Sequence, residues 1–294
     1  MRKNFFLSVF ISVISALTGS AQLSDLARID YTLIPKGSSG IEYRRARVLF
    51  NYPIKVKKDT YLLLGLDYSN IDISFDEGIT SFDTNEIIDF QLLDLNIGYT
   101  FKINETWRFG AVVTPGVSSN LSRGDLSFRD VVFSGDIVLI KDKSKDPTIS
   151  KPYRLILGIS YSENRGIPFP LPFISYYRKF HPKWSFNIGI PKTNLQYHIS
   201  NQSRLKLFAQ LDGFNANIQR DLIVNEIERA DNVKMSLILS GLRYEYKFNN
   251  RLEFFINGAY LLSNSVQLRN DNSDVITLNN DNKMYYRAGI RFKI

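Results

Sequence analysis

Apolar and polar residues alternate in short segments along most of the chain, as expected for β-strands that bury one face. The segments follow one another without a helix-period stretch or a linker, so the pattern predicts a single all-β domain. The last segment, Lys283 to Ile294, has one apolar and one basic face. Many apolar faces end in Tyr, Trp or Phe, which favours an antiparallel transmembrane β-barrel whose strands meet the membrane interface there. The clearest apolar faces are Ala46, Val48, Phe50, Tyr52, Ile54; Leu62, Leu64, Leu66, Tyr68; Leu93, Leu95, Ile97, Tyr99, Phe101; Trp107, Phe109, Ala111, Val113; Tyr153, Leu155, Leu157, Ile159, Tyr161; and Leu252, Phe254, Ile256, Gly258, Tyr260, Leu262.

Connection lengths determine the expected number of strands. Short turns are expected at residues 57–59, 104–106, 181–183, 201–203 and 249–250, and long polar loops near 70–87, 119–126, 218–231 and 265–282. Outer-membrane barrels keep short turns on the periplasmic side and long loops outside. All short turns share one side only if two further elements are included: a first strand at about Arg28 to Pro35, with Ile29, Tyr31 and Leu33 outward, and a hairpin within Trp184 to Ile199, bent at Pro191. This gives fourteen strands, and the last strand is then expected to pair with the first and close the barrel. The alternative is twelve strands, with the N-terminus as a plug and that hairpin merged into one strand.

The N-terminus predicts export. Arg2 and Lys3 precede a mostly apolar run from Phe5 to Leu17, and Gly19, Ser20 and Ala21 suit a signal peptidase. We therefore expect a signal peptide at residues 1–21 and a barrel domain at residues 22–294, located in the cell outer membrane of a Gram-negative bacterium. The alternative, an N-terminal membrane anchor, needs a longer apolar run.

The composition agrees with a barrel that has a water-filled lumen, and it excludes chemistry that depends on cysteine. The mean hydropathy is −0.15 and aromatic residues make up 13% of the chain, as suits strands with one lipid-facing side. With no cysteine, the chain has neither disulfides, nor thiolate metal sites, nor a cysteine nucleophile. The formal charge of +8 becomes +6 once Arg2 and Lys3 are removed with the signal peptide, which suits anionic lipid or an anion-lined pore. Nucleic acid is not expected as a partner at this location.

The terminal strand carries the sharpest motif. Arg287, Gly289, Phe292 and Ile294 have the polar, glycine, aromatic and hydrophobic spacing that the outer-membrane insertion machinery reads on a last strand. The chain thus resembles Gram-negative outer-membrane β-barrels, although many of these end in phenylalanine. The resemblance implies contact with outer-membrane lipid and lipopolysaccharide, the barrel-insertion machinery and periplasmic chaperones.

A second resemblance comes from the order of features along the chain. Asp30-Tyr31-Thr32, Asn51-Tyr52-Pro53-Ile54, Pro170-Leu171-Pro172 and Gly189-Ile190-Pro191 are similar to an uncharacterised Bacteroidota barrel family, a domain of unknown function. Fourteen strands are also similar to channels of the fatty-acid transporter type. Those carry a long N-terminal hatch, whereas only a handful of residues separate Gln22 from the first strand.

Strand parity places more bases than acids on the lumen side. An excess of bases would bias a water-filled lumen toward anions. Alternatively, the bases pair with acids into a salt-bridge lattice that closes the lumen, or lie at the periplasmic rim. The candidate bases are Arg45, Arg47, Lys102, Arg108, Arg154, Lys206, Arg243, Lys247, Arg287, Arg291 and Lys293, and the candidate acids are Asp94, Asp136, Asp212, Glu245 and Glu253.

The candidates for catalysis are weak. His181 and His198 are expected at short periplasmic turns, away from the outer rim where lipid-modifying and proteolytic barrels act. Carboxylate pairs such as Asp76-Glu77 are expected in solvated loops, and no phosphate-binding glycine loop occurs. We therefore expect no enzyme activity, no catalytic residue, no cofactor and no metal.

The sequence favours a passive channel or uptake component for small solutes. The alternative from a different class is a structural or ligand-binding surface barrel with a closed lumen, and an outer-membrane enzyme is a third. The open radius of the lumen separates the first from the second.

Overall fold

The structure is a computed structural model that describes residues 25–144, 146, 148–165, 169–226, 228–271, 273–278 and 282–293. The expected signal peptide and residue Ile294 of the expected insertion signal lie outside the described residues. No helix in the described part of the chain is long and apolar enough to cross a membrane.

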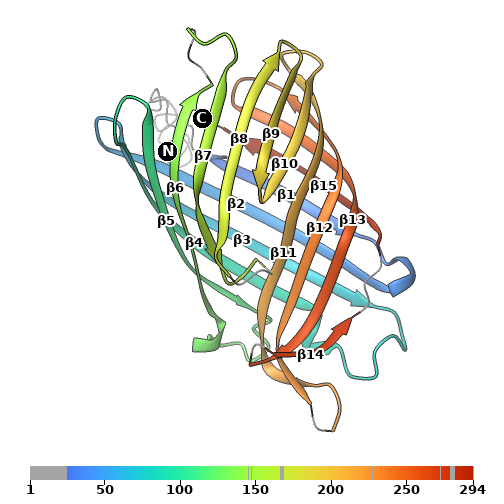
Figure 1. Cartoon of the computed structure of the whole chain (residues 1–294). Coiled ribbons are helices and arrows are strands. Elements are labelled where there is room, and N and C mark those ends of the chain that lie inside the picture. Colours follow the sequence, from blue (N-terminus) through green and yellow to red (C-terminus); the bar gives the residue numbers. More distant parts are fainter. Residues whose placement is uncertain are drawn as a thin grey trace, which may run out of the picture.

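The described chain forms a closed antiparallel barrel (Figure 1). Consecutive strands pair from β1 to β13, and β15 closes the wall between β13 and β1; among the described residues, β14 pairs with β13 alone. Fourteen of the fifteen strands thus form the wall, which confirms the fourteen-strand prediction and shows that the twelve-strand alternative is wrong. The strands are β1 (Ala27–Ile34), β2 (Ile41–Lys57), β3 (Thr60–Phe75), β4 (Asp89–Lys102), β5 (Trp107–Ser119), β6 (Val131–Lys143), β7 (Tyr153–Ser162), β8 (Leu171–His181), β9 (Trp184–Ile190), β10 (Lys192–His198), β11 (Ser203–Ile223), β12 (Arg229–Lys247), β13 (Leu252–Asn270), β14 (Ser273–Leu278) and β15 (Met284–Phe292); the short 3-10 turns are η1 (Gly37–Ser39), η2 (Asn85–Ile87) and η3 (Phe128–Asp130).

The first and last strands close the wall as predicted. Ile29 lies opposite Ile290 and Tyr31 opposite Ala288, so the outward apolar faces of β1 and β15 are continuous. Closure leaves no open edge along this seam. The hairpin predicted around Pro191 is β9 and β10.

A belt of exposed apolar side chains surrounds the barrel, as lipid contact requires. Leu64, Leu66, Leu93 and Leu95 are examples on adjacent strands. Toward the end with the short turns, which we assign to the periplasm, aromatic rings are in contact: Tyr99 with Phe101, Tyr176 with Phe186, and Trp184 with Tyr197, among others. These contacts form an interfacial girdle.

The polarity of the wall inverts toward the opposite, extracellular end. On β3 the outward residues change from Leu64 and Leu66 to exposed Asp72, while the inward residues change from Asp67 to fully buried Ile71. The same exchange occurs on the neighbouring strands β2, β4, β11, β12 and β13. A water-exposed barrel with an apolar interior thus continues the membrane barrel along the same strands.

This inversion corrects the predicted loops. β3 continues to Phe75, β11 to Ile223 and β13 to Asn270, all within stretches that the sequence suggested were loops near 70–87, 218–231 and 265–282. The prediction assumed that outward residues stay apolar to the end of each strand. Above the membrane, outward residues are polar instead, because their surroundings are water.

The barrel narrows toward the extracellular end, because strands β7 to β10 are short. β9 and β10 have seven residues each, whereas β11 has 21 (Figure 1). Beyond β10, β11 meets β5 instead: Asn217 pairs with Ser119 in parallel orientation, and the Asn120 N–H donates to the Asn217 carbonyl at 3.2 Å. We call the part of the barrel beyond this contact, bounded by β2–β5 and β11–β13, the neck.

An apolar cluster fills the neck. Its members include Ile71, Phe90, Phe214, Leu239 and Leu268, all fully buried, and among the described residues none comes from β5 to β10. Narrow barrels are generally filled by side chains in this way. We call this cluster the extracellular core; it closes the lumen at the extracellular end.

Asp130 of η3 secures the junction between β5 and β11. Its buried carboxylate accepts from Asn217 Nδ2 at 2.6 Å, from Gln219 Nε2 at 2.7 Å and from the Ser127 N–H at 2.7 Å. Burial acts to raise the pKa of Asp130, but hydrogen bonding from Ser119, Ser127, Gln219 and Asn217 outweighs it, so that pKa lies below its ordinary value. The stabilisation is therefore complete above the ordinary carboxyl pKa of about 4 and is lost as the pH falls through the lower folded value.

We expect Asp130→Ala to loosen this junction by about 1–3 kcal/mol, because buried donors lose their acceptor. Limited proteolysis of the extracellular face at neutral pH measures the loss, with exposed Asp125→Ala as the control. Equal cleavage of the two variants would contradict the role of Asp130.

Candidate functional site

The lumen below the extracellular core contains a salt-bridge network, which begins at the β1–β15 seam. Arg287 on β15 contacts Asp30 on β1 at 2.7 Å, and Arg28 contacts the other oxygen of the same carboxylate at 2.9 Å. Asp30 is 3% exposed. The charges of these strands therefore neutralise each other across the closing seam.

A second part of the network is built around Glu245 of β12. Its carboxylate contacts four bases on three strands: Arg204 at 2.6 Å, Lys206 at 2.9 Å, Arg243 at 2.8 Å and Arg291 at 2.8 Å. Adjacent Glu253 contacts Arg204 at 2.8 Å and Lys293 at 2.9 Å, and also pairs with Arg291. These two acids therefore offset part of the positive charge of the five bases on β11, β12 and β15 and next to β15.

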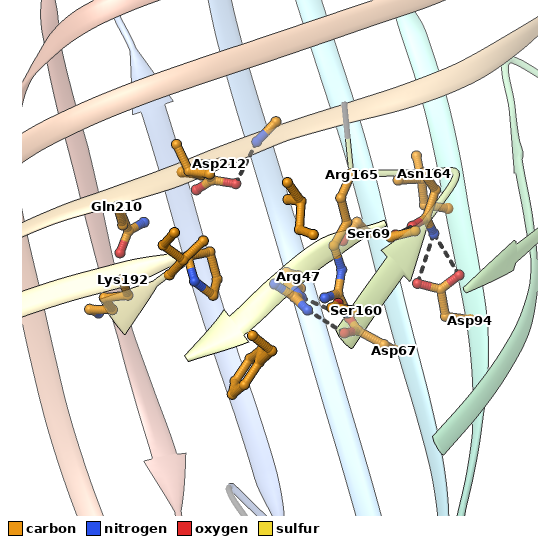
Figure 2. A pocket seen from close by; sticks show the side chains of 18 of the residues that line it. Arg47, Asp67, Ser69, Asp94, Ser160, Asn164, Arg165, Lys192, Gln210 and Asp212 are labelled. Atoms are coloured by element: carbon orange, nitrogen blue, oxygen red, sulfur yellow. Dashed lines mark hydrogen bonds and ion pairs between the residues drawn. The ribbon is translucent and has the colours of Figure 1, made fainter. Parts of the chain in front are cut away.

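A cavity of about 360 Å³ lies between the network and the extracellular core, and we call it the central cavity. Arg47 and Asp67 form a two-pronged pair on its β2–β3 wall, and Asn164 Nδ2 donates to both Asp94 oxygens at 2.7 and 2.9 Å (Figure 2). Lys192 and Gln210, which are register partners on β10 and β11, line another wall.

The central cavity reaches the outer surface of the wall. Pro172, Ile190 and Leu211 belong to outward-facing positions of their strands, yet they also line the cavity. Beyond Gln210, β11 is no longer paired with β10. Two backbone hydrogen bonds follow on this side of β11 in the described structure. The Leu211 N–H donates to the Pro191 carbonyl at 3.0 Å, and the Asn215 N–H donates to the Asn164 carbonyl at 3.1 Å. We call the opening bounded by these links and by the tips of β7 to β10 the side mouth.

Gly213 lies between these two links. Its φ of 147° is rare for other residues, and an added Cβ would lie 2.1 Å from the Met235 carbonyl oxygen. Leu211 pairs with Ile238, which is exposed in the apolar belt, whereas polar Ser236 and Lys234 follow on the outside of β12. The side mouth therefore lies at the outer edge of the apolar belt.

A second cavity of about 310 Å³ continues toward the periplasm, and we call it the basic cavity. It shares Phe173, Ile190, Pro191 and Lys192 with the central cavity. Its described lining includes the bases Arg154, Lys192 and Lys206 and no acid. Lys206 is paired with Glu245 of the network, so Arg154 and Lys192 are the lining bases that have no ion pair in the described structure.

A third cavity of about 320 Å³ leads to the periplasmic end and shares Arg154 with the basic cavity. Arg108 and Lys102 line it together with several acids. One is Asp146, on the connection between β6 and β7, where hydrogen bonds from Thr148 and Lys143 lower its pKa to about 2. Mixed charge at this end replaces the purely basic lining above it.

The predicted lumen bases are found in different parts of this arrangement. Arg45 donates to Ser69 at 3.0 Å, and Arg47 pairs with Asp67. Among the described residues, neither Arg108 nor Arg154 has an ion pair, and Arg108 Nη1 donates to the Asp59 carbonyl at 2.9 Å. The predicted bases Arg243, Arg287 and Arg291 belong to the network described above. Gly289 and Phe292 of the expected insertion signal lie on β15 beside them.

Several charged residues of the lumen were missed. Arg28, Asp30, Asp67, Lys192 and Arg204 all face inward and line the cavity or join the network. The same strand parity that identified Arg45 would have found Arg28 and Asp30, since Ile29 and Tyr31 were placed outward. Lys192 had no such signal, because it begins a short strand directly after Pro191.

The two histidines lie at the ends of β8 and β10, beside short turns. His198 Nε2 lies 2.8 Å from Ser185 Oγ, but Ser185 is fully buried and the described residues provide no carboxylate partner for His198. No group of three or more described His, Asp or Glu side chains is placed to hold a metal ion.

Comparisons with solved structures return channels and other proteins at low sequence identity. An outer membrane channel from Pseudomonas putida F1 is 10% identical, with 94% of this chain and 97% of that chain covered and a TM-score of 0.44. LpxR from Salmonella typhimurium is 9% identical, with 91% of this chain and 100% of that chain covered and a TM-score of 0.41. The translocator domain of the autotransporter NalP from Neisseria meningitidis is 11% identical, with 100% of this chain and 96% of that chain covered and a TM-score of 0.39. These values are too low to transfer a solute or an activity.

A search of curated proteins finds no match. The family model described as "Domain of unknown function (DUF6268)" matches residues 36–293, nearly the whole barrel. The described chain is a closed fourteen-stranded antiparallel barrel, and the chain belongs to this family.

Proposed function

We propose that the protein is a passive channel for small solutes, in which the solute passes through the side mouth rather than through the neck. The observation that supports this is the row of three cavities from the side mouth to the periplasmic end. The first two share four lining residues, and the last two share Arg154. The extracellular core closes the alternative route along the barrel axis.

The charges along this row favour anions. In the described structure the network neutralises Arg28, Arg47 and Arg287, whereas Arg154 and Lys192 make no ion pair. Both line the basic cavity, where no acid offsets them. Charges lining a narrow passage act on ions at short range, where screening by salt is incomplete.

Single-channel recording in planar bilayers tests this proposal. We expect discrete conductance and a reversal potential in a KCl gradient that shows preference for chloride. The double variant Arg154→Met, Lys192→Met should lose most of that preference, while Lys58→Met, at an exposed turn, should keep it. A folded, inserted protein without conductance would overturn the channel proposal.

A ligand-binding surface barrel is the second candidate. Leu126 and Phe128, in the connection between β5 and β6, are 67% and 89% exposed and thus provide an apolar contact surface outside the membrane. Replacing both by serine should leave conductance unchanged if the protein is a channel. Silent bilayers together with loss of a surface ligand on this replacement would favour the second candidate.

A further inference from the structure

The side mouth leads into a cavity whose two sides differ in chemistry. The residues near the mouth are mostly apolar: Phe169, Leu171, Phe173, Ile190, Pro191 and Leu211. The opposite wall carries arginines and carboxylates from β1 to β4 and β15. A molecule that fills the cavity therefore meets hydrocarbon at one end and charge at the other.

Most of that charge is already neutralised. Arg47 is held by Asp67, Arg28 by Asp25 and Asp30, and Arg287 by Asp30 and Asp212. Arg45 donates to Ser69 and lies 3.9 Å from Asp212. These four arginines have little capacity left for an additional anion. Arg165, which follows β7, also lines the cavity without an ion pair in the described structure, but its side chain is exposed to water.

Lys192 differs from them. Its ammonium makes neither a hydrogen bond nor an ion pair in the described structure, and its contact there is with the ring of Phe208, 5.3 Å from the ring centroid. It lies where the central and basic cavities join, and Gln210 is its register partner on β11 (Figure 2). A partly buried ammonium without a counter-charge favours binding of an anion.

We propose that the central cavity binds a small amphipathic carboxylate, with its carboxylate on Lys192 and Gln210 and its hydrocarbon part against the apolar residues of the side mouth. One unpaired base beside one amide matches a single negative charge better than the double charge of a phosphate. The volume of about 360 Å³ is within the range of small-molecule sites. Because the mouth lies at the edge of the apolar belt, such a molecule can arrive from water or from the outer leaflet.

This inference deepens the proposed channel function. Only the transport of the bound molecule rests on that function; the binding site itself does not. Binding is measured without any transport, by calorimetric titration of the purified protein in detergent with hexanoate, hexanamide and acetate. Hexanoate should bind about 10- to 100-fold more tightly than hexanamide, as expected for one charged hydrogen bond. Acetate, which lacks the hydrocarbon part, should bind more weakly than hexanoate.

Lys192→Met should remove the preference for hexanoate over hexanamide, and Lys192→Arg should retain it. Lys58→Met is the matched control and should bind as the wild type does. Heat-dependent gel mobility verifies that each variant is folded. Hexanoate binding that is unchanged in Lys192→Met, or equal for hexanoate and hexanamide in the wild type, would overturn the inference.

Two further measurements separate the related questions. The first is a titration in nanodiscs that compares dodecanoate dissolved in the lipid with hexanoate added in water; it shows from which phase the ligand is taken. If neither ligand binds in a way that depends on Lys192, the proposed site is overturned. Binding without conductance would reject the channel and keep the site, whereas conductance without binding would reject the site and keep the channel.

Discussion

A bulky charged group attached at position 173 is expected to reduce the conductance of the channel almost to the bilayer baseline. Phe173 lines both the central and the basic cavity, so a group there narrows the passage where the two meet. The chain has no cysteine, and Phe173→Cys therefore provides a single reactive thiol. The measurement is the single-channel current before and after addition of a trimethylammonium methanethiosulfonate reagent.

The control for this experiment is Lys58→Cys, which puts the same thiol on an exposed periplasmic turn. Labelling of the Lys58→Cys protein should leave its current unchanged, and reduction should restore the current of the labelled Phe173→Cys protein. Full conductance after complete labelling at position 173 would show that ions do not use the cavity row.

The second large effect is expected from Glu245→Gln. The change removes the charge that four buried or half-buried bases share, and their mutual repulsion is then unbalanced. Breaking a buried ion pair on one side typically costs about 3–5 kcal/mol. Urea titration of the protein folded in lipid vesicles, followed by fluorescence of Trp107 and Trp184, measures the free energy of unfolding.

Glu105→Gln is the matched control. Glu105 also pairs with a base, Lys102 at 3.2 Å, but its side chain is 98% exposed. A pair of this kind contributes at most about 1 kcal/mol. If the two variants are equally stable, the network around Glu245 does not hold the barrel together.

The sequence predicted the wall of the barrel well because period-two alternation responds directly to lipid on one side and water on the other. The pairing of β1 with β15 around Ile29 and Ile290 followed from the same alternation and from the even strand number. The extracellular ends of the strands were missed because the outside of the wall faces lipid lower down and water higher up. Apolar residues therefore point outward in the membrane, as Leu66 does on β3, and inward above it, as Ile71 does.

The cavities could not be predicted in this way. The neck exists because β11 passes the short hairpin β9–β10 and contacts β5, which joins Ser119 to Asn217 across almost a hundred residues of sequence. Parity assigns a side chain to the lumen, but it does not reveal which charges neutralise each other there. Thus Arg47, which the sequence placed in the lumen, forms an ion pair with Asp67. Lys192, which the sequence did not indicate, has no counter-charge in the described structure.

The central claim is that solute bypasses the neck, and a disulfide across the neck tests it most directly. Ser119 and Asn217 lie opposite each other where β5 meets β11, so cysteines at both positions are within reach of a bond that holds the neck closed. The measurement is the conductance of the Ser119→Cys, Asn217→Cys protein in its oxidised and reduced forms. We predict the same conductance in both; a current that disappears on oxidation and returns on reduction would contradict passage through the side mouth.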